Sequence, residues 1–382
     1  MTNFALRTSP WIALAALLAH ALGPACAVAQ RNPAATSIRL ERLLVLGGDD
    51  SPANATFVDV SDIATSASGE IYVVDAGDRA VKVYTSSGRF VRRFGRQGGG
   101  PGEFQLPSGL RVDTLVRVSD LGQQRMSLFT LDGRHLQTVR SPQIGDTPLL
   151  QMTPLRNGST VGATPARMGV SGSGSTRVGS PYVAVLTIRQ GSPPDTLLRL
   201  HSGVSTFHPR DGLVPFGGID SHVGRGGAHA VLGDSLVATA DGYSGEVRWY
   251  RADRGGLTLF RTRLLPSRSR PVAAGDVQRI RRSLYAESPD LPRGLVVEPP
   301  PRISVATQAV FSTDGALWIR NTAGKGHAHV WTVFDQAGDI ALRLSLPAGF
   351  ELRHVRGDRL YGIARTENDV PVIHVYRLVQ GR

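Results

Sequence analysis

The 382-residue chain predicts an all-β fold, a six-bladed β-propeller of four-stranded blades, and three observations carry this prediction. Short runs rich in β-branched and aromatic residues alternate with glycine- and aspartate-containing turns. The same order of runs recurs six times along the chain. Beyond residue 30, only one short segment keeps a helical period. Because a lone four-stranded unit cannot bury both of its faces, such units stack around an axis.

The first repeat shows the pattern most clearly. A strand at 68–75 is followed by a polar loop, a second strand at 81–84 and a hairpin at Ser87-Gly88 that leads into a third strand. The same order starts again near residues 113, 157, 233, 314 and 357. The sequence therefore predicts six units, some of them enlarged by insertions.

The last unit is incomplete, and this predicts how the ring closes. It ends near Leu378 after only three strands, whereas the apolar segment 38–46 precedes the first unit without a partner. We expect segment 38–46 to be the outer strand of the sixth blade. The propeller domain then spans residues 37–380 and is fastened by both ends of the chain.

Two segments interrupt the repeat. Residues 168–181 are rich in glycine and serine, and they predict a mobile loop of blade 3. Between blades 4 and 5, Asp276 is positioned to cap a short helix with apolar residues at 277, 280 and 284. Three prolines at 299–301 end regular structure there.

Residues 1–29 are typical of a secretory signal peptide. Arg7 precedes an apolar run from Trp11 to Leu22, and Ala27-Val28-Ala29 fits a cleavage site. The run is shorter than the roughly 20 residues of a membrane-spanning helix, so we expect no transmembrane segment in the mature chain. We predict an exported protein, periplasmic or secreted. A lipid anchor on Cys26 is the alternative, although Gly23-Pro24-Ala25 departs from the usual lipidation pattern.

Cysteine and charge exclude several function classes. Cys26 is the single cysteine, which excludes a disulfide framework, a cysteine zinc site and a CxxC redox centre. The formal charge is +12, yet only Lys82 and Lys325 are lysines, so the arginine excess is also what GC-rich codon usage would produce. Nucleic acid is not predicted as a partner, because no basic stripe is interleaved with aromatic residues.

Much of the positive charge is concentrated in residues 248–293. This concentration predicts an anion-binding basic patch at Arg279, Arg281 and Arg282, with anionic envelope components as candidate partners.

Two motifs resemble a known family. The segment 94–107, FGRQGGGPGEFQLP, is similar to the inter-blade connector of NHL-repeat proteins, and 118–125 resembles their strand-Asp-loop-Arg element. Blade 1 matches in part, since it has Asp75 and Gly77 but Ala80 where blade 2 has Arg125. The resemblance implies a six-bladed, TolB-like propeller of the kind found in exported bacterial proteins.

In a propeller, the loops between the second and third strands of the blades gather on one face. We predict that this loop face binds a protein or a polar or anionic ligand, such as a small molecule or a glycan, because arginine offers paired donors to carboxylate or phosphate. An alternative interpretation is that these residues, Asp120 with Arg125 above all, form ion pairs that brace loops. The candidate residues are Asp75, Arg79, Asp120, Arg125, Asp241, Tyr243, Arg320, Asn321, Lys325, Arg365 and Glu367.

No catalytic constellation is evident. There is no G-x-S-x-G motif, and the glycine run at 98–102 lacks the Gly-Lys-Ser/Thr ending of a phosphate loop. The sequence therefore predicts a binding or scaffolding module without catalytic residues or a cofactor. The alternative is a lactonase-like, metal-dependent hydrolase or lyase, since the resemblance extends to such six-bladed enzymes. Its one divalent cation would lie in the central opening, with His327 and His329 as candidate ligands.

Overall fold

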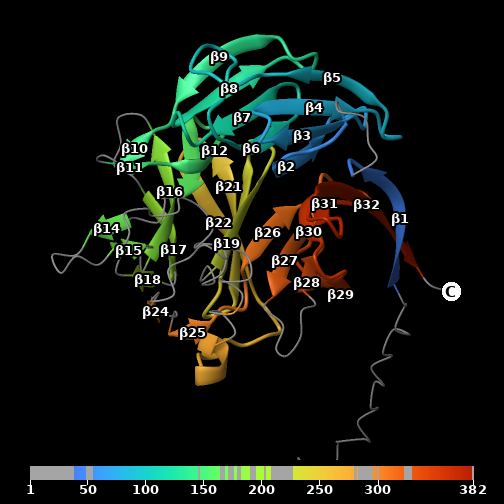
Figure 1. Ribbon diagram of the computed structural model, residues 1–382. Coiled ribbons are helices and arrows are strands. Elements are labelled where there is room, and N and C mark those ends of the chain that lie inside the picture. Colours follow the sequence, from blue (N-terminus) through green and yellow to red (C-terminus); the bar gives the residue numbers. More distant parts are fainter. Residues whose placement is uncertain are drawn as a thin grey trace, which may run out of the picture. The chain divides into compact units, whose positions relative to one another are not determined.

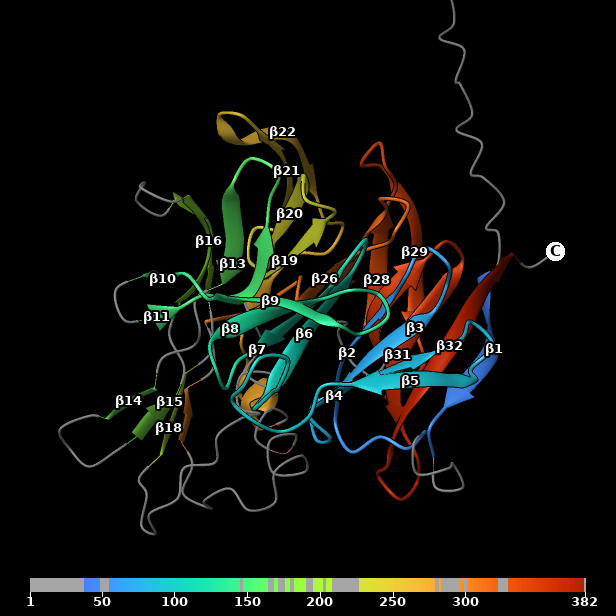
Figure 2. The same ribbon diagram turned by 90° about the horizontal axis from the view of Figure 1, so that it is seen from above.

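The computed structural model, shown in Figures 1 and 2, describes residues 38–48, 55–144, 147–163, 168–170, 176–178, 182–189, 195–201, 204–207, 227–278, 282, 296–298, 301–321 and 329–380. Residues Arg39–Val379 form one compact unit, which is the propeller. The predicted signal peptide at 1–29, including Cys26, lies outside the described residues.

Antiparallel four-stranded sheets follow one another along the chain as blades. Blade 1 consists of β2 (Val60–Thr65), β3 (Ile71–Asp75), β4 (Ala80–Tyr84) and β5 (Phe90–Phe94). Blade 2 consists of β6 (Pro107–Val112), β7 (Val116–Asp120), β8 (Arg125–Phe129) and β9 (His135–Arg140). Blade 3 consists of β12 (Leu150–Pro154), β13 (Ser159–Ala163), β16 (Tyr182–Arg189) and β17 (Asp195–His201).

The second half of the chain continues this order. Blade 4 consists of β19 (Gly227–Leu232), β20 (Leu236–Asp241), β21 (Glu246–Asp253) and β22 (Gly256–Leu264). Blade 5 consists of β26 (Gln308–Phe311), β27 (Leu317–Asn321), β28 (His329–Phe334) and β29 (Ile340–Leu346). Blade 6 consists of β30 (Glu351–Arg356), β31 (Arg359–Arg365), β32 (Pro371–Gln380) and β1 (Ile38–Leu46). The predicted all-β propeller of four-stranded blades is confirmed.

Burial within a blade explains the hydrophobic pattern of its strands. In blade 1, every residue of β3 and β4 is buried, whereas the outermost strand β5 alternates between half-buried and exposed residues. Central strands are covered by neighbouring blades on both faces, so they read as continuous apolar runs. The hairpins into the outermost strands of blades 1 and 2 turn at Gly88 and Gly133, whose φ angles of 91° and 95° favour glycine.

The hydrophobic core lies between the blades. Among the described residues, a separate buried apolar cluster occupies each junction between successive blades, and a further one joins blade 6 to blade 1. At that last junction, Tyr361 and Ile373 of blade 6 pack with Ile63 and Tyr84 of blade 1. Each blade therefore depends on two neighbours for its burial.

The N-terminal strand closes the ring, as predicted. β1 pairs with β32 at the outer edge of blade 6, so the first and last described strands lie side by side (Figures 1 and 2). Glu41 of β1 forms an ion pair with Arg377 of β32 at 2.8 Å. Leu40 packs against the cluster between blades 5 and 6, and Leu46 is buried in the cluster between blades 6 and 1.

The insertions differ from the predictions in two respects. Segment 168–181 is not simply a loop, because it contains β14 (Met168–Val170) and β15 (Thr176–Val178), which join β18 (Val204–Phe207) and β24 (Val296–Glu298) in a separate four-stranded sheet. The short strands β10 (Gln143–Ile144) and β11 (Thr147–Pro148), and β23 (Arg270–Pro271) and β25 (Arg302–Ile303), form two-stranded sheets.

The predicted helix between blades 4 and 5 is described at 274–278 and at 282, and Asp276 is not its N-cap residue. Ile280 and Leu284 of its predicted apolar face lie outside the described residues. The carbonyl of Ala273 accepts the amide of Val277, so Ala273 occupies the cap position. The Asp276 carboxylate reaches back to the Ala273 amide at 2.9 Å and pairs with Arg270. Asp276 thus acts as the third helical residue of a capping box.

In the part of the chain that the structure describes, no helix is long and apolar enough to cross a membrane.

Deleting residues 37–46 should destabilise the whole propeller. The deletion removes an outer strand of blade 6 and apolar contacts at two blade junctions, so we expect a single unfolding transition with a melting temperature lowered by about 10 °C or more. Scanning calorimetry of the mature chain with and without the segment measures this. An unchanged melting temperature would contradict closure by β1.

Candidate functional site

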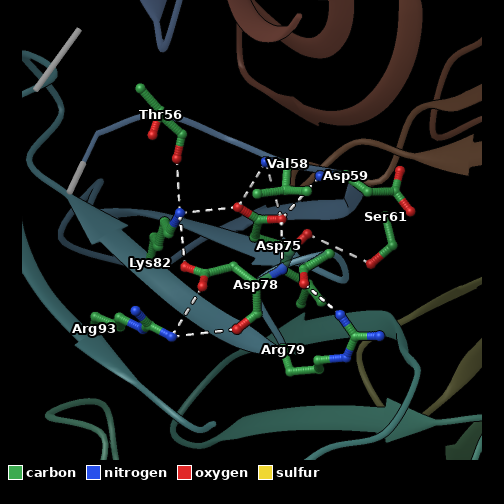
Figure 3. Close-up of polar contacts among 11 residues, drawn as sticks. Thr56, Val58, Asp59, Ser61, Asp75, Asp78, Arg79, Lys82 and Arg93 are labelled. Atoms are coloured by element: carbon green, nitrogen blue, oxygen red, sulfur yellow. Dashed lines mark hydrogen bonds and ion pairs between the residues drawn. The ribbon is translucent and has the colours of Figure 1, made fainter. Parts of the chain in front are cut away.

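Two predicted loop-face carboxylates occupy equivalent positions at the ends of β3 and β7. Asp75 accepts hydrogen bonds from the backbone amides of Val58, Asp59 and Asp78 (Figure 3). Asp120 accepts the corresponding bonds from the amides of Gln105, Leu106 and Gln123. Both aspartates are at most 2% exposed. Each therefore fastens its own turn to the connector that enters its blade.

In each of these two blades, a cationic side chain donates hydrogen bonds to carbonyls of the same connector. We call the aspartate, the cation and their contacts with the connector the brace of the blade. In blade 2, Arg125 donates hydrogen bonds to the carbonyls of Gly99, Gly100 and Glu103 at 2.7–3.0 Å. Asp120 and Arg125 form no ion pair with each other; both bind the connector instead. Asp120 and Arg125 do stabilise the loops, as the alternative interpretation expected. The ion pair that it expected between these two side chains is not formed.

Lys82 takes this role in blade 1, where Ala80 replaces the arginine. Its ammonium group donates to the Thr56 carbonyl at 2.7 Å and pairs with Asp75 at 2.9 Å and Asp78 at 3.0 Å (Figure 3). Lys82 is 3% exposed, so these bonds compensate for the cost of burying its charge. The sequence did contain a signal for this role, since Lys82 is one of two lysines in the chain and lies within an otherwise apolar strand. The sequence analysis assigned no role to it.

Both braced turns have the same backbone. Arg79 and Gln124, each four residues after the aspartate, have a φ angle of 50°. Gly77 and Gly122 lie against the connector, where an added Cβ would come within 2.5 Å of Val58 and 2.8 Å of Gln105. The turn therefore requires glycine at this position. The Arg79 guanidinium donates to the Gly77 carbonyl, within its own turn.

The remaining described loop-face candidates also contact residues of their own blade or its adjoining loops. Asp241 accepts the amide of Tyr243, whose carbonyl accepts the Ser269 hydroxyl.

In blades 5 and 6 the pattern is the same. Arg320 donates to the Thr307 hydroxyl, and Asn321 donates to the Thr332 hydroxyl. Arg365 pairs with Asp369, and Glu367 is exposed in the same turn. The contacts described do not join these residues into one site, and ligand binding by them stays a prediction.

Several predicted residues cannot be placed in a site. Lys325, His327, Arg279 and Arg281 lie outside the described residues, and only the backbone of His329, the first residue of β28, is described. Arg282 is helical and exposed. Among the described side chains, no group of three or more His, Cys, Asp or Glu could hold a metal ion.

A second set of polar side chains, which the sequence analysis missed, connects the innermost strands. Asp62 of β2 accepts the Leu110 amide of β6 at 2.8 Å, and the side-chain amide of Gln308 in β26 donates to the Leu352 carbonyl of β30 at 2.7 Å. The ring of His354 in β30 and the Thr65 hydroxyl in β2 are 2.8 Å apart. The bonds of Asp62 and Gln308 satisfy backbone groups of a neighbouring blade, and the contact of His354 with Thr65 joins two side chains.

Burial shifts the pKa of two members of this set in opposite directions. It raises the pKa of Asp62 to about 6, against the stabilising field of Arg353. It lowers the pKa of His354 to about 4, with Arg356 contributing in the same direction. The sequence signal for this set was a charged residue within the innermost strand of a blade, as Asp62 is in Val60-Ser61-Asp62-Ile63.

An open depression of about 760 Å³ lies beside the brace of blade 2. Arg125 and Arg140 are directly opposite each other in the β8–β9 pairing. Like charges directly opposite each other in a sheet repel, which is unfavourable. The depression is lined by Gln105, Gly122, Gln123, Gln124, Arg125, Thr138, Arg140, Ser141 and Gln143.

Comparisons with known proteins support the fold. Residues 52–146 match a family described as a 6-bladed beta-propeller. A search of curated proteins returned no match. Among solved structures, a Bacteroides fragilis protein named "Putative exported protein" is similar over 90% of this chain and 96% of its own, with 14% identity and a TM-score of 0.51.

Two enzymes are similar at lower scores. The luciferin-regenerating enzyme has 11% identity and a TM-score of 0.44, covering 91% of this chain and 98% of its own. Streptogramin B lyase has 9% identity and a TM-score of 0.44, covering 90% and 98%. The similarity at a TM-score of 0.51 supports the propeller fold, and none of these similarities assigns an activity.

Replacing Lys82 by methionine should weaken the propeller strongly. The substitution leaves the buried Asp75 carboxylate and the Thr56 carbonyl without their cation, so the free energy of unfolding should fall by about 3–5 kcal/mol. Arg93→Met is the matched control, because Arg93 also pairs with Asp78 but its side chain is 45% exposed. We expect the control to cost about 1 kcal/mol or less. Equal, small losses in denaturant titrations would contradict the brace.

His354 should make stability fall in acid. Its folded pKa of about 4 lies below the unfolded value near 6.5, so the unfolded chain binds the proton first and the contribution of His354 to stability decreases as the pH falls from 6.5 towards 4. The raised pKa of Asp62 acts in the opposite direction below about pH 6, equally in the unaltered protein and in a His354 variant. The loss amounts to as much as about 3 kcal/mol. Denaturant titrations at pH 7 and pH 4.5 should show a smaller loss for His354→Gln than for the unaltered protein. Parallel losses would contradict a buried neutral histidine.

Proposed function

We propose that this chain is an exported, NHL-like propeller that serves as a binding module for a polar, anionic ligand, and that the depression on blade 2 is its binding site. The N-terminal pattern of residues 1–29 supports export, as does the name of the similar Bacteroides fragilis protein. The braced connector of blade 2, which carries the motifs resembling NHL repeats, supports the repeat type.

The single observation that carries the binding site is its charge. The described lining residues contain two arginines, four glutamines and two hydroxyl groups but no carboxylate. Arg125 is engaged with connector carbonyls, and the Asp120 carboxylate beside it is occupied by backbone amides. Arg140 is exposed. An anion beside the two guanidinium groups would relieve their repulsion and receive paired hydrogen bonds from Arg140.

The glutamines suit the same class of ligand. Side-chain amides both donate and accept, so Gln105, Gln124 and Gln143 at the rim can bind hydroxyl groups. Anionic glycans, which combine carboxylates with many hydroxyls, have the chemistry that this lining recognises. A scaffold that holds such a ligand needs no catalytic residue.

Polygalacturonate tests the proposal. Calorimetric titration at 0.15 M salt should show binding to the purified protein and none to neutral dextran. Arg140→Gln should weaken the affinity about tenfold, because one charge-assisted contact of that strength contributes about 1.4 kcal/mol.

The control is Arg343→Gln, which makes the same change of charge at an exposed position of β29. It should leave the affinity unchanged. An equal effect of both substitutions would show that net charge, rather than the depression, attracts the polymer and would contradict the proposed site.

A further inference from the structure

The innermost strands of blades 6 and 1 carry two opposite charges. Asp62 lies on β2 and Arg353 on β30, and these two strands contact each other. Both side chains are only partly buried, in contrast to the neighbouring Ile63 and Leu352. Arg353 is the extra residue of a β-bulge between Leu352 and His354, which alters the direction of its side chain.

The two charges are held apart. Asp62 accepts the amides of Ile63 and Leu110 at 2.9 and 2.8 Å, which fixes its carboxylate between β2 and β6. Arg353 donates to Glu351 at 2.8 Å. Arg353 acts on Asp62 through its electric field, yet no ion pair within 4.0 Å joins the two groups.

Neither charge has a buried counter-charge, because Asp62 is bonded to backbone amides and Arg353 pairs with Glu351, whose side chain is 58% exposed. Exposed ion pairs of this kind are weak, so both groups can still gain from a further partner. The Nε–H of Arg353 is buried and has no acceptor among the described residues. Direct pairing would need the backbone bonds of Asp62 or the Glu351 contact of Arg353 to break. A small molecule with one positive and one negative group would satisfy both charges without moving either.

We propose that β2 and β30, the innermost strands of blades 1 and 6, bind a small zwitterion. Its ammonium group would contact Asp62 and its carboxylate would contact Arg353. This site uses different residues from the blade 2 depression and does not depend on the function proposed there. Blade 5 contributes Gln308, which is already bonded to Leu352 of β30 and helps to fix the strand that carries Arg353.

A series of ω-amino acids from glycine to 5-aminovalerate tests the proposal by varying the distance between the two charges. Calorimetric titration at pH 7.5 should find one member that binds at least tenfold more tightly than butyrate or butylamine, which carry one charge each. Arg353→Gln should abolish this preference, and so should Asp62→Asn. Arg343→Gln should retain it.

The pH dependence gives a second readout. Among the described residues, Arg353 is the charged group whose electric field acts on Asp62. On the side of β6, the Asp62 carboxylate accepts the Leu110 amide, which is uncharged. Protonation of Asp62 removes the partner of the ammonium group, so affinity should fall as the pH decreases below about 6. Failure of every zwitterion to exceed the singly charged probes would overturn the proposal. A preference that persists in folded Arg353→Gln would also overturn it.

Discussion

The stability of the propeller depends on holding each connector against the blade that it enters. Connectors turn sharply, so their backbone amides and carbonyls leave the sheet ladders and need other partners where they are buried. In blades 1 and 2 an aspartate takes the amides, and a cation, Lys82 or Arg125, takes the carbonyls. Because a carboxylate accepts several bonds and a cation donates several, two side chains satisfy a whole turn.

A second level of bonds operates at the inner edges, through Asp62, Gln308 and His354. Apolar clusters join the neighbouring blades as well. The described loop-face candidates contact residues of their own blade or its adjoining loops. The two ligand sites that we propose use the lining of the blade 2 depression and the charges on the innermost strands.

The sequence predicted the features that depend on local pattern. Alternating apolar runs and glycine turns located the strands, and the unpartnered segment before the first repeat predicted closure by β1. Lys82 was not assigned, because its role depends on Thr56 and Asp78, which only the folded blade brings to its ammonium group. The strands in 168–181 were missed, because their sheet is completed by β18, which pairs with β15, and by β24, which pairs with β18 and lies far away in the sequence.

The axis was equally inaccessible to sequence reasoning. Asp62 and Arg353 are almost three hundred positions apart in the sequence. Their strands contact each other only because the ring closes and blade 6 packs against blade 1. In the sequence, a polar residue at either position is also what the solvent-facing side of a strand would show. What distinguishes them is the bulge at Arg353 and the amide partners of Asp62, both of which are properties of the assembled sheets.

Hydrogen exchange measured by mass spectrometry on the unaltered protein and the Lys82→Met variant tests the role of the connectors most directly. If the brace couples successive blades, exchange in the variant should accelerate in the connector around Val58, in β2 and also in β30 of blade 6, which packs on β2. Acceleration confined to β4 itself, with β2 and β30 unchanged, would contradict the account.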